Sequence, residues 1–519
     1  MRYSLAELPS SQHRAGLAGL VLHTRWVARQ PNKVGLYELT SLDERGASFE
    51  FDDQGMKFGF DDLYAASMDE IACKTKRKKG KKENQKEVPP LRTEVREGSD
   101  GKGGVKTLTE YIYPQVVPRG GMVLDFEQGA QGLWIKLWRD FIWQIMRGVP
   151  AQRVPFNARA NGDAVKDHLE TLTALRDPEA SVALPSTYFV GAQEKTAEDV
   201  PFLDRARFQL LLRYWPLVVP IYVPQVFDVH KGESRWNGFA VAVPDVALLE
   251  SYCEELPIVL RDRSCEPQGY RPKAAVVDFP AETALDFAVR LRERLSRVEG
   301  AKASGDLVHA FDVLHVEKQG NNVRLLSTAR VAPDTPMIDE YARWSGALRD
   351  PVFRRQRLLN LMANRSWYAG FSGVIETIPV KTQGLGSRKF RHDARITFEH
   401  ERETMTDDEN GSLEQAIYRM CNTYVRIRLK RKHGLNWKDV ANDEKEKAAY
   451  AKAKEDIARD VFLAIRGRHG DDFLEYFAGS IGAVPHHLSE VQFVRFTRLL
   501  RANPDDARTL TLLAMSAVG

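Results

Sequence analysis

The stretch SLEQAIYRMCNTYVRIRLKRKHG, residues 412–434, decides how the C-terminal part of this chain folds. Apolar side chains recur in it at alternating steps of four and three, which places them on one stripe of an α-helix: Leu413, Ile417, Met420, Tyr424 and Ile427. Gly434 is the stop expected after such a helix. Cations lie away from the stripe, at Arg419, Arg426, Lys430 and Arg431. The pattern predicts a helix that packs on one side and presents positive charge on the other.

The remainder of the tail is also predicted to be helical. A second helix is expected from about Asp443 to Arg466, shorter ones around Phe473–Phe477 and from Leu488 to Arg501, and a last apolar helix after the break at Asn503-Pro504-Asp505. We therefore expect a C-terminal helical bundle over residues 405–519. Its basic face indicates contact with nucleic acid, and the alternative is an ordinary bundle whose Lys and Arg are only solvated.

Composition limits the class of protein. A chain of 519 residues is too long for one compact core, so we expect regions at 1–150, 151–404 and 405–519. The net charge is only +4, and any affinity for nucleic acid must come from clustered charge. The four cysteines show no CxxC spacing, which argues against structural zinc and a disulfide framework and favours the cytoplasm. No signal peptide or apolar run of spanning length is evident, so no membrane partner is expected.

The body of the chain has the pattern of an α+β protein. Helices are expected at Gln12–Gln30 and Ala281–Val298, a strand at Ala274–Phe279, and a hairpin pairing Val313–Val316 with Val323–Ala329. The aromatic helix Trp134–Trp143 carries Trp134, Trp138 and Phe141 on one face, which we assign to the core and not to base stacking.

The strongest basic cluster lies in residues 74–86, which contain almost nothing apolar. Such a segment cannot bury enough surface to order itself, so a mobile loop is expected, extended by the glycine-rich residues 98–104. Clustered lysines suit contacts with the phosphate backbone that do not read sequence. The alternative is a solvated insertion without a partner. The cations of this basic segment are Lys74, Lys76, Arg77, Lys78, Lys79, Lys81 and Lys82.

Catalytic motifs are missing from the sequence: there is no phosphate-binding P-loop, no HExxH helix, no GxSxG elbow and no GxGxxG. Gly384-Leu385-Gly386 is expected in a loop made cationic by Lys381, Arg388, Lys389 and Arg391. His392-Asp393, predicted in a polar loop before a strand, is the one pair that suggests a metal-dependent phosphohydrolase, and it would need further ligands. We expect no enzyme activity, no metal and no cofactor. The rival hypothesis is a nuclease with scattered Asp, Glu and His ligands.

Three stretches resemble a known family. They are LPSSQHRAGL at residues 8–17, the helix Trp134–Trp143 with Leu137-Trp138-Arg139-Asp140, and NRSWYAGF at residues 364–371. Together they resemble the large subunit of a type I CRISPR interference complex, Cascade, and are most similar to a type I-B-like subgroup. The resemblance implies a non-catalytic subunit that inspects a protospacer-adjacent motif on duplex DNA while guide RNA reads the sequence. It also implies a C-terminal bundle, similar to the separate small subunit, along the path of the DNA strands.

The partners implied by the resemblance are CRISPR RNA, double-stranded target DNA, the other Cascade subunits and a recruited effector, either a nuclease-helicase or a transposition machinery. In some subtypes an internal start yields the small subunit, and Met405 is the candidate here; loss of a short C-terminal product on Met405→Leu would support this. A plain RNA-binding scaffold without duplex contact is a further alternative.

Roles follow for the basic residues and amides. The basic segment is predicted to grip the duplex backbone, and the C-terminal helix to hold the displaced strand through Arg426, Arg428, Lys430 and Arg431. Motif reading needs amides or arginines at a groove, and the candidates are Gln12, Arg14, Asn157 and Asn161. Gln12 and Arg14 are equally suited to hold the RNA 5′ handle or to cap the first helix.

Overall fold

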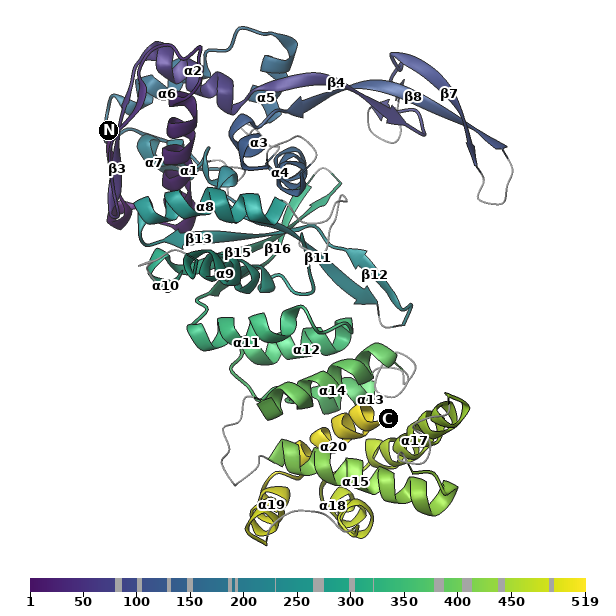
Figure 1. The fold of residues 1–519 in the computed structure, drawn as a ribbon. Helices are drawn as coiled ribbons and strands as arrows, with labels where there is room; N and C mark the ends of the chain where they lie inside the picture. Colours follow the sequence, from purple (N-terminus) through teal and green to yellow (C-terminus); the bar gives the residue numbers. More distant parts are fainter. Residues whose placement is uncertain are drawn as a thin grey trace. The chain divides into compact units, whose positions relative to one another are not determined.

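A computed structural model describes the chain except for residues 80–85, 100–104, 128–131, 147–152, 185–188, 192–194, 229, 265–274, 298–303, 321, 378–386, 404–412, 437–443 and 485–489. It forms two compact units. The first comprises Met1–Val223 with Gly238–Pro333, and the second comprises Pro224–Asn237 with Asp334–Gly519. The first unit combines sheets with helices and the second is mostly helical (Figure 1), so the predicted α+β class is confirmed. Met405 lies outside the described residues.

Helix α1 (Ser11–Ala28) lies in the core of the first unit and packs on strand β13. The predicted helix is confirmed, with its apolar side chains fully buried at Leu17, Leu20 and Val21. Gly16 and Gly19 lie against the backbone carbonyls of Leu211 and Tyr214, where an added Cβ would collide. Two glycines one turn apart therefore let this helix approach the neighbouring backbone closely.

Two sheets flank this core, and of the larger one β12 and residues 224–228 of β11 belong to the second unit. A small sheet has the order β1-β3-β2 (Arg2–Ser4, Gly46–Phe51 and Tyr37–Asp43), and a larger one has the order β12-β11-β13-β15-β16. The bounds in the larger sheet are Ile221–Asp228 for β11, Glu233–Trp236 for β12, Phe239–Val246 for β13, Val308–Gln319 for β15 and Asn322–Val331 for β16. The predicted hairpin is confirmed as β15 and β16, which pair from Gln319 and Asn322 onward.

The strand predicted at 274–279 is mostly wrong, because β14 spans only Val276–Val277. The backbone N–H of Asp278 donates to the Glu282 carboxylate at 2.7 Å, and Pro280 follows, so the chain turns here into helix α9 (Glu282–Leu295). Helix α9 itself confirms the predicted one. The other helices of the first unit are α2 (Asp53–Leu63), α3 (Gly121–Glu127), α4 (Leu133–Gln144), α5 (Arg153–Asn161), α6 (Asp167–Leu175), α7 (Ala206–Leu211), α8 (Leu249–Ser264) and α10 (Ser304–Leu307). In α4 the aromatic face is buried as predicted.

A third sheet has the order β4-β8-β7 (Ala66–Cys73, Val105–Pro118 and Arg92–Ser99). The basic segment follows β4. Its described ends are not a free loop, because Lys78–Lys79 (β5) pairs antiparallel with Lys86–Glu87 (β6). A further short pair is formed by β9 (Ser181–Ala183) and β10 (Leu203–Arg205).

The second unit is built around helix α20 (Pro504–Val518), which is buried from Ala507 to Val518. Among the described residues, the helices that pack against it are α13 (Phe371–Thr377), α14 (Arg388–Glu403), α15 (Leu413–His433), α17 (Glu444–Arg466), α18 (Gly470–Tyr476) and α19 (Glu490–Ala502). Helices α11 (Thr335–Ser345) and α12 (Pro351–Met362) precede them. The buried run is mostly apolar, and its buried polar side chains bond within the unit: Arg508 pairs with Glu376, and the hydroxyls of Thr509, Thr511 and Ser516 donate to carbonyls one turn earlier. Among the described residues no helix is both long and apolar enough to cross a bilayer.

Helix α15 confirms the predicted helix, with one change in its buried stripe. Ile417, Met420 and Tyr424 are buried as expected, but Ile427 is only half-buried and the last turns bury Val425 and Leu429 instead. A strict alternation of four and three averages 3.5 residues, whereas the α-helix has 3.6 per turn, so the buried stripe drifts along a straight helix.

Candidate nucleic-acid interface

The cations of α15 form the clearest basic surface in the second unit. Arg426, Arg428, Lys430 and Arg431 are all exposed, and none forms an ion pair within the part of the chain that the structure describes. The guanidinium of Arg428 lies 5.3 Å from the centre of the Tyr424 ring, which holds it along the helix. We call these four residues the α15 row. A helix whose last turns carry unpaired, exposed cations suits the phosphate backbone of a nucleic-acid strand.

The basic segment is partly held on its own sheet. Lys76 pairs with Glu87 at 3.0 Å, which raises the pKa of Lys76, and lies 5.9 Å from the centre of the Tyr111 ring. Arg77 stacks at 5.0 Å on Tyr113, whose hydroxyl accepts the backbone N–H of Arg77 at 2.9 Å. Lys74 is exposed at the end of β4, and Lys78 and Lys79 form β5. Lys81 and Lys82 lie outside the described residues.

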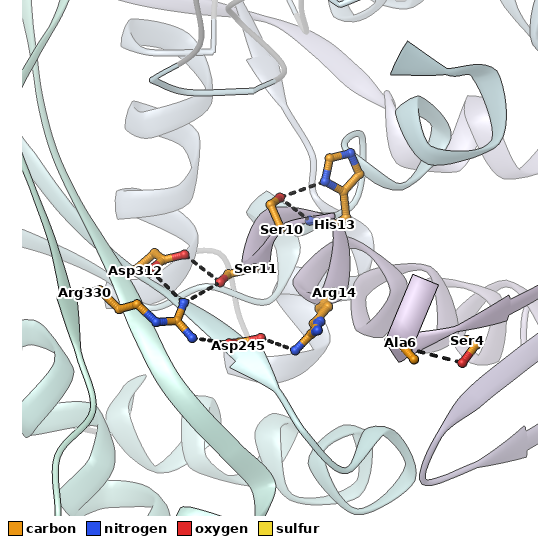
Figure 2. A network of polar contacts seen from close by, with 9 residues as sticks. All are labelled: Ser4, Ala6, Ser10, Ser11, His13, Arg14, Asp245, Asp312 and Arg330. Atoms are coloured by element: carbon orange, nitrogen blue, oxygen red, sulfur yellow. Dashed lines mark hydrogen bonds and ion pairs between the residues drawn. The ribbon is translucent and has the colours of Figure 1, made fainter. Parts of the chain in front are cut away.

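Arg14 belongs to a closed network of charges at the start of α1 (Figure 2). Its guanidinium is 2.6 Å from the Asp245 carboxylate, and Arg330 binds both Asp245 and Asp312, the latter at 3.2 Å. Ser11 donates its hydroxyl to Asp312 at 2.6 Å. The two arginines neutralise the two aspartates and tie α1 to β13, β15 and β16.

Gln12 is buried and forms two hydrogen bonds with the backbone of Val190. Its amide donates to the Val190 carbonyl at 3.0 Å and accepts the Val190 N–H at 3.2 Å. The side chain therefore fixes the loop at Val190 to the start of α1. On α5, by contrast, Asn157 is half-buried and Asn161 exposed, and neither side chain bonds to another described residue. Of the four residues proposed to read the motif or hold RNA, these two asparagines present unoccupied amides.

The loop expected at 384–393 is wrong for its second half, because helix α14 begins at Arg388. The Ser387 hydroxyl caps the start of this helix by accepting the N–H of Phe390 at 3.1 Å. The glycines at 384 and 386 had suggested that the loop continues through this position. Arg388 and Lys389 are exposed in its first turn, and Arg391 pairs with Glu455 of α17 at 2.9 Å. Lys381 lies outside the described residues.

His392 and Asp393 also belong to α14, not to a polar loop. Asp393 is fully buried and accepts the backbone N–H groups of Arg349 and Asp350 at 2.8 and 2.6 Å. Burial raises its pKa to about 7, while burial and nearby Arg349 lower the pKa of His392. The described residues contain no cluster of three His, Cys, Asp or Glu that would hold a metal ion. Asp393 therefore holds the turn before α12 in place, which is a structural task.

Two further cations near the predicted basic residues were not predicted as candidate site residues. Arg395 follows Arg391 by one turn on α14, and Lys454 lies on α17 next to Glu455. Arg391, Arg395 and Arg426 all act electrostatically on the ammonium group of Lys454 and, after burial, lower its pKa, so charges from three helices influence one another. A helix predicted at 388–403 would have placed Arg391 and Arg395 on one face, since residues four apart on a helix share a face. Nothing in the sequence pattern of α17 indicated Lys454.

Comparison with protein families matches residues 36–301 to the type I-B CRISPR Cas8b N-terminal domain and residues 308–518 to the type I-B CRISPR Cas8b C-terminal domain. The chain belongs to the Cas8b family. It is thus the large subunit of a type I-B CRISPR interference complex, which contains other Cas subunits and CRISPR RNA, and the resemblance of the three stretches is confirmed. Large subunits of this kind are generally non-catalytic components. A search of curated proteins found no match.

Proposed function

We propose that this Cas8b chain recognises the protospacer-adjacent motif on duplex DNA, helps to open the duplex and stabilises the R-loop that the guide RNA forms. In such a complex guide pairing reads the sequence, and the protein supplies motif contacts and backbone contacts. The α15 row carries this proposal, because four exposed cations without carboxylate partners form a surface for a strand that must be held without reading its bases.

The contacts are divided among the two units. The basic segment grips the duplex backbone beside the motif, through Lys74 and the neighbouring cations. Asn157 and Asn161 are the residues we assign to motif reading, because their amides are not used inside the protein. Arg14 and Gln12 hold the start of α1. We assign them an indirect role in holding the RNA handle, in which they position α1 and the loop at Val190 without contacting the RNA.

The α15 row is tested in the complete complex, assembled with guide RNA and the other subunits. Replacing all four cations by Gln should weaken capture of the displaced strand and reduce the slope of log affinity against log salt by about 3, at about 0.7 per phosphate contact on a single strand. Strand opening is measured with 2-aminopurine placed in the displaced strand.

The control removes four exposed cations of the first unit, at Lys57, Lys166, Arg176 and Arg324. It should leave that slope unchanged. Preference for the correct motif should survive in the α15 variant, because backbone contacts do not discriminate bases. Unaltered strand opening in the α15 variant would refute the assignment.

A further inference from the structure

One tyrosine side chain bonds to both strands of a short hairpin in the basic segment. The hydroxyl of Tyr113, on β8, accepts the backbone N–H of Arg77 at 2.9 Å and donates to the carbonyl of Val88 at 3.3 Å. Arg77 and Val88 are also joined directly, since the Val88 N–H donates to the Arg77 carbonyl at 2.9 Å. The paired strands β5 and β6 follow immediately. We call residues 76–79 and 86–88 the basic hairpin.

The first strand of the basic hairpin also contacts aromatic rings of β8. The guanidinium of Arg77 lies 5.0 Å from the centre of the Tyr113 ring, and the ammonium group of Lys76 lies 5.9 Å from the centre of the Tyr111 ring. Tyr111 and Tyr113 are two residues apart on one strand, so both rings point to the same face of the sheet β4-β8-β7. The basic hairpin is therefore docked on that face.

The other face of this sheet carries arginines that are already paired. In the register of β7 with β8, Arg92 and Arg96 project from the face opposite the two tyrosines. Arg92 pairs with Glu70 at 2.6 Å and with Glu94 at 2.8 Å, and Arg96 pairs with Glu94 at 3.0 Å. Lys74, by contrast, is exposed and has no ion pair in the part of the chain that the structure describes. Contacts with phosphate are therefore expected from the basic segment and not from these two arginines.

The basic hairpin is too short to be ordered by its own pairing. Isolated two-stranded hairpins are marginally stable in water, and β5 and β6 contribute two residues each. Contacts with β8 must therefore supply the order, and the buried Tyr113 bonds to both strands at once. Order that exists before a ligand arrives reduces the conformational entropy that is lost when the cations bind it.

We propose that Tyr113 is a positioning residue for duplex binding, whose hydroxyl holds the basic hairpin in the conformation in which its cations meet the phosphate backbone. The hydroxyl itself contacts no phosphate. It acts on the backbone of Arg77 and Val88, and through that backbone on the lysines that follow Arg77. The choice of duplex DNA rests on the proposed function, which assigns the basic segment to the duplex backbone.

The test uses the full-length chain and a fluorescein-labelled duplex of 30 base pairs, with fluorescence anisotropy measured over a series of salt concentrations. Tyr113→Phe keeps the ring and removes the hydroxyl. It should weaken duplex binding about 5- to 30-fold, which corresponds to the loss of two neutral hydrogen bonds. The slope of log affinity against log salt should not change, because every cation remains and still neutralises a phosphate in the complex.

Two comparison variants give the limits of this effect. Tyr111→Phe is the matched control, because Tyr111 lies on the same strand and face, but its hydroxyl bonds to no other described residue. It should bind like the unaltered chain. Replacing Lys74 and Lys76 together by Gln should weaken binding and also reduce the salt slope by about 1.8, at about 0.9 for each phosphate contact on duplex DNA.

Hydrogen exchange separates positioning from loss of folding. In the free chain Tyr113→Phe should accelerate exchange of the amides of Arg77 and Val88, and Tyr111→Phe should not. The amides of β4, β7 and β8 should exchange as in the unaltered chain. Faster exchange throughout these three strands would mean that the sheet has lost its fold, and the positioning role would be overturned.

The outcomes distinguish this role from the wider proposal. If Tyr113→Phe binds the duplex as tightly as Tyr111→Phe while the double lysine variant binds weakly, the positioning role is wrong and the proposed function stands. If Tyr113→Phe reduces the salt slope as the lysine variant does, phosphate contacts are lost outright and the positioning role is again wrong. If the unaltered chain binds no duplex at low salt, the proposed duplex contact fails together with the role of Tyr113.

Discussion

Replacing Asp393 should separate a structural role from a catalytic one. This buried carboxylate accepts the backbone N–H groups of Arg349 and Asp350, and Asp350 in turn accepts those of Val352 and Phe353 at the start of α12. Asp393→Ala would leave the buried N–H of Asp350 without a partner and the exposed turn at Arg349 unrestrained. At about 1–3 kcal/mol for each unsatisfied group, the second unit should lose about 2–4 kcal/mol of unfolding free energy.

Asp393→Asn keeps one acceptor and should cost about half as much, about 1–2 kcal/mol. The pH dependence provides a second readout. The pKa of Asp393 is raised to about 7 in the folded chain, above its unfolded value of about 3.9. A raised pKa means that the stability it contributes is full at acid pH and is lost as the pH rises through 7. The slope there should be at most about 1.4 kcal/mol per pH unit, and Asp393→Asn should lack it.

The assay is urea unfolding of the full chain between pH 5.5 and 8.5, together with hydrogen exchange of the amides of residues 349 and 350. Both variants should accelerate this exchange, while Asp460→Asn, an exposed carboxylate on α17, should not. Equal pH slopes for the unaltered chain and Asp393→Asn would refute the reasoning. So would a magnesium-dependent cleavage activity that Asp393→Asn abolishes without loss of stability, since that result would favour the nuclease hypothesis.

The remaining predictions concern packing. Gly16→Ala should destabilise the first unit by more than about 3 kcal/mol or prevent folding, because the added Cβ would collide with the backbone carbonyl of Leu211. Gly373→Ala on α13 has open space around it and should be neutral or stabilising by up to about 1 kcal/mol. Thermal unfolding of the two variants measures the difference. Arg508→Met should cost the second unit about 1–3 kcal/mol, because it removes the 2.7 Å partner of Glu376, which is partly exposed and keeps only His469 at 3.8 Å. Exposed Arg498→Met should change the unfolding free energy by less than about 0.5 kcal/mol, and a similar loss in both arginine variants would contradict this argument.

Local patterns predicted several helices and one hairpin correctly. The helix at 412–434, the hairpin of β15 and β16 and the aromatic face of α4 each depend on the spacing of apolar residues within one segment, and the structure confirms them. Most of the strand predicted at 274–279 and the second half of the loop predicted at 384–393 were wrong for a similar reason. At each place a single side chain, Glu282 or Ser387, accepts a backbone N–H group at the start of a helix, and the pattern of apolar residues does not show that bond.

For the candidate site, the sequence located the cations but not their partners. It identified the α15 row, and the structure leaves those four residues exposed. The sequence also suggested that Arg14 and Arg391 are available to bind nucleic acid. In the structure Arg14 pairs with Asp245 and Arg391 pairs with Glu455, both distant in sequence.

By itself the sequence determined the α+β class, the helical C-terminal bundle and the resemblance to the large subunit, because periodicity and short motifs are properties of neighbouring residues. Only the tertiary structure decided which charges are free. Whether a cation is available for phosphate depends on the carboxylates that folding brings within about 4 Å of it, and these come from positions tens to hundreds of residues away. The electrostatic influence of Arg395 and Arg426 on Lys454 is of this kind, since three helices must pack before their charges act on one another.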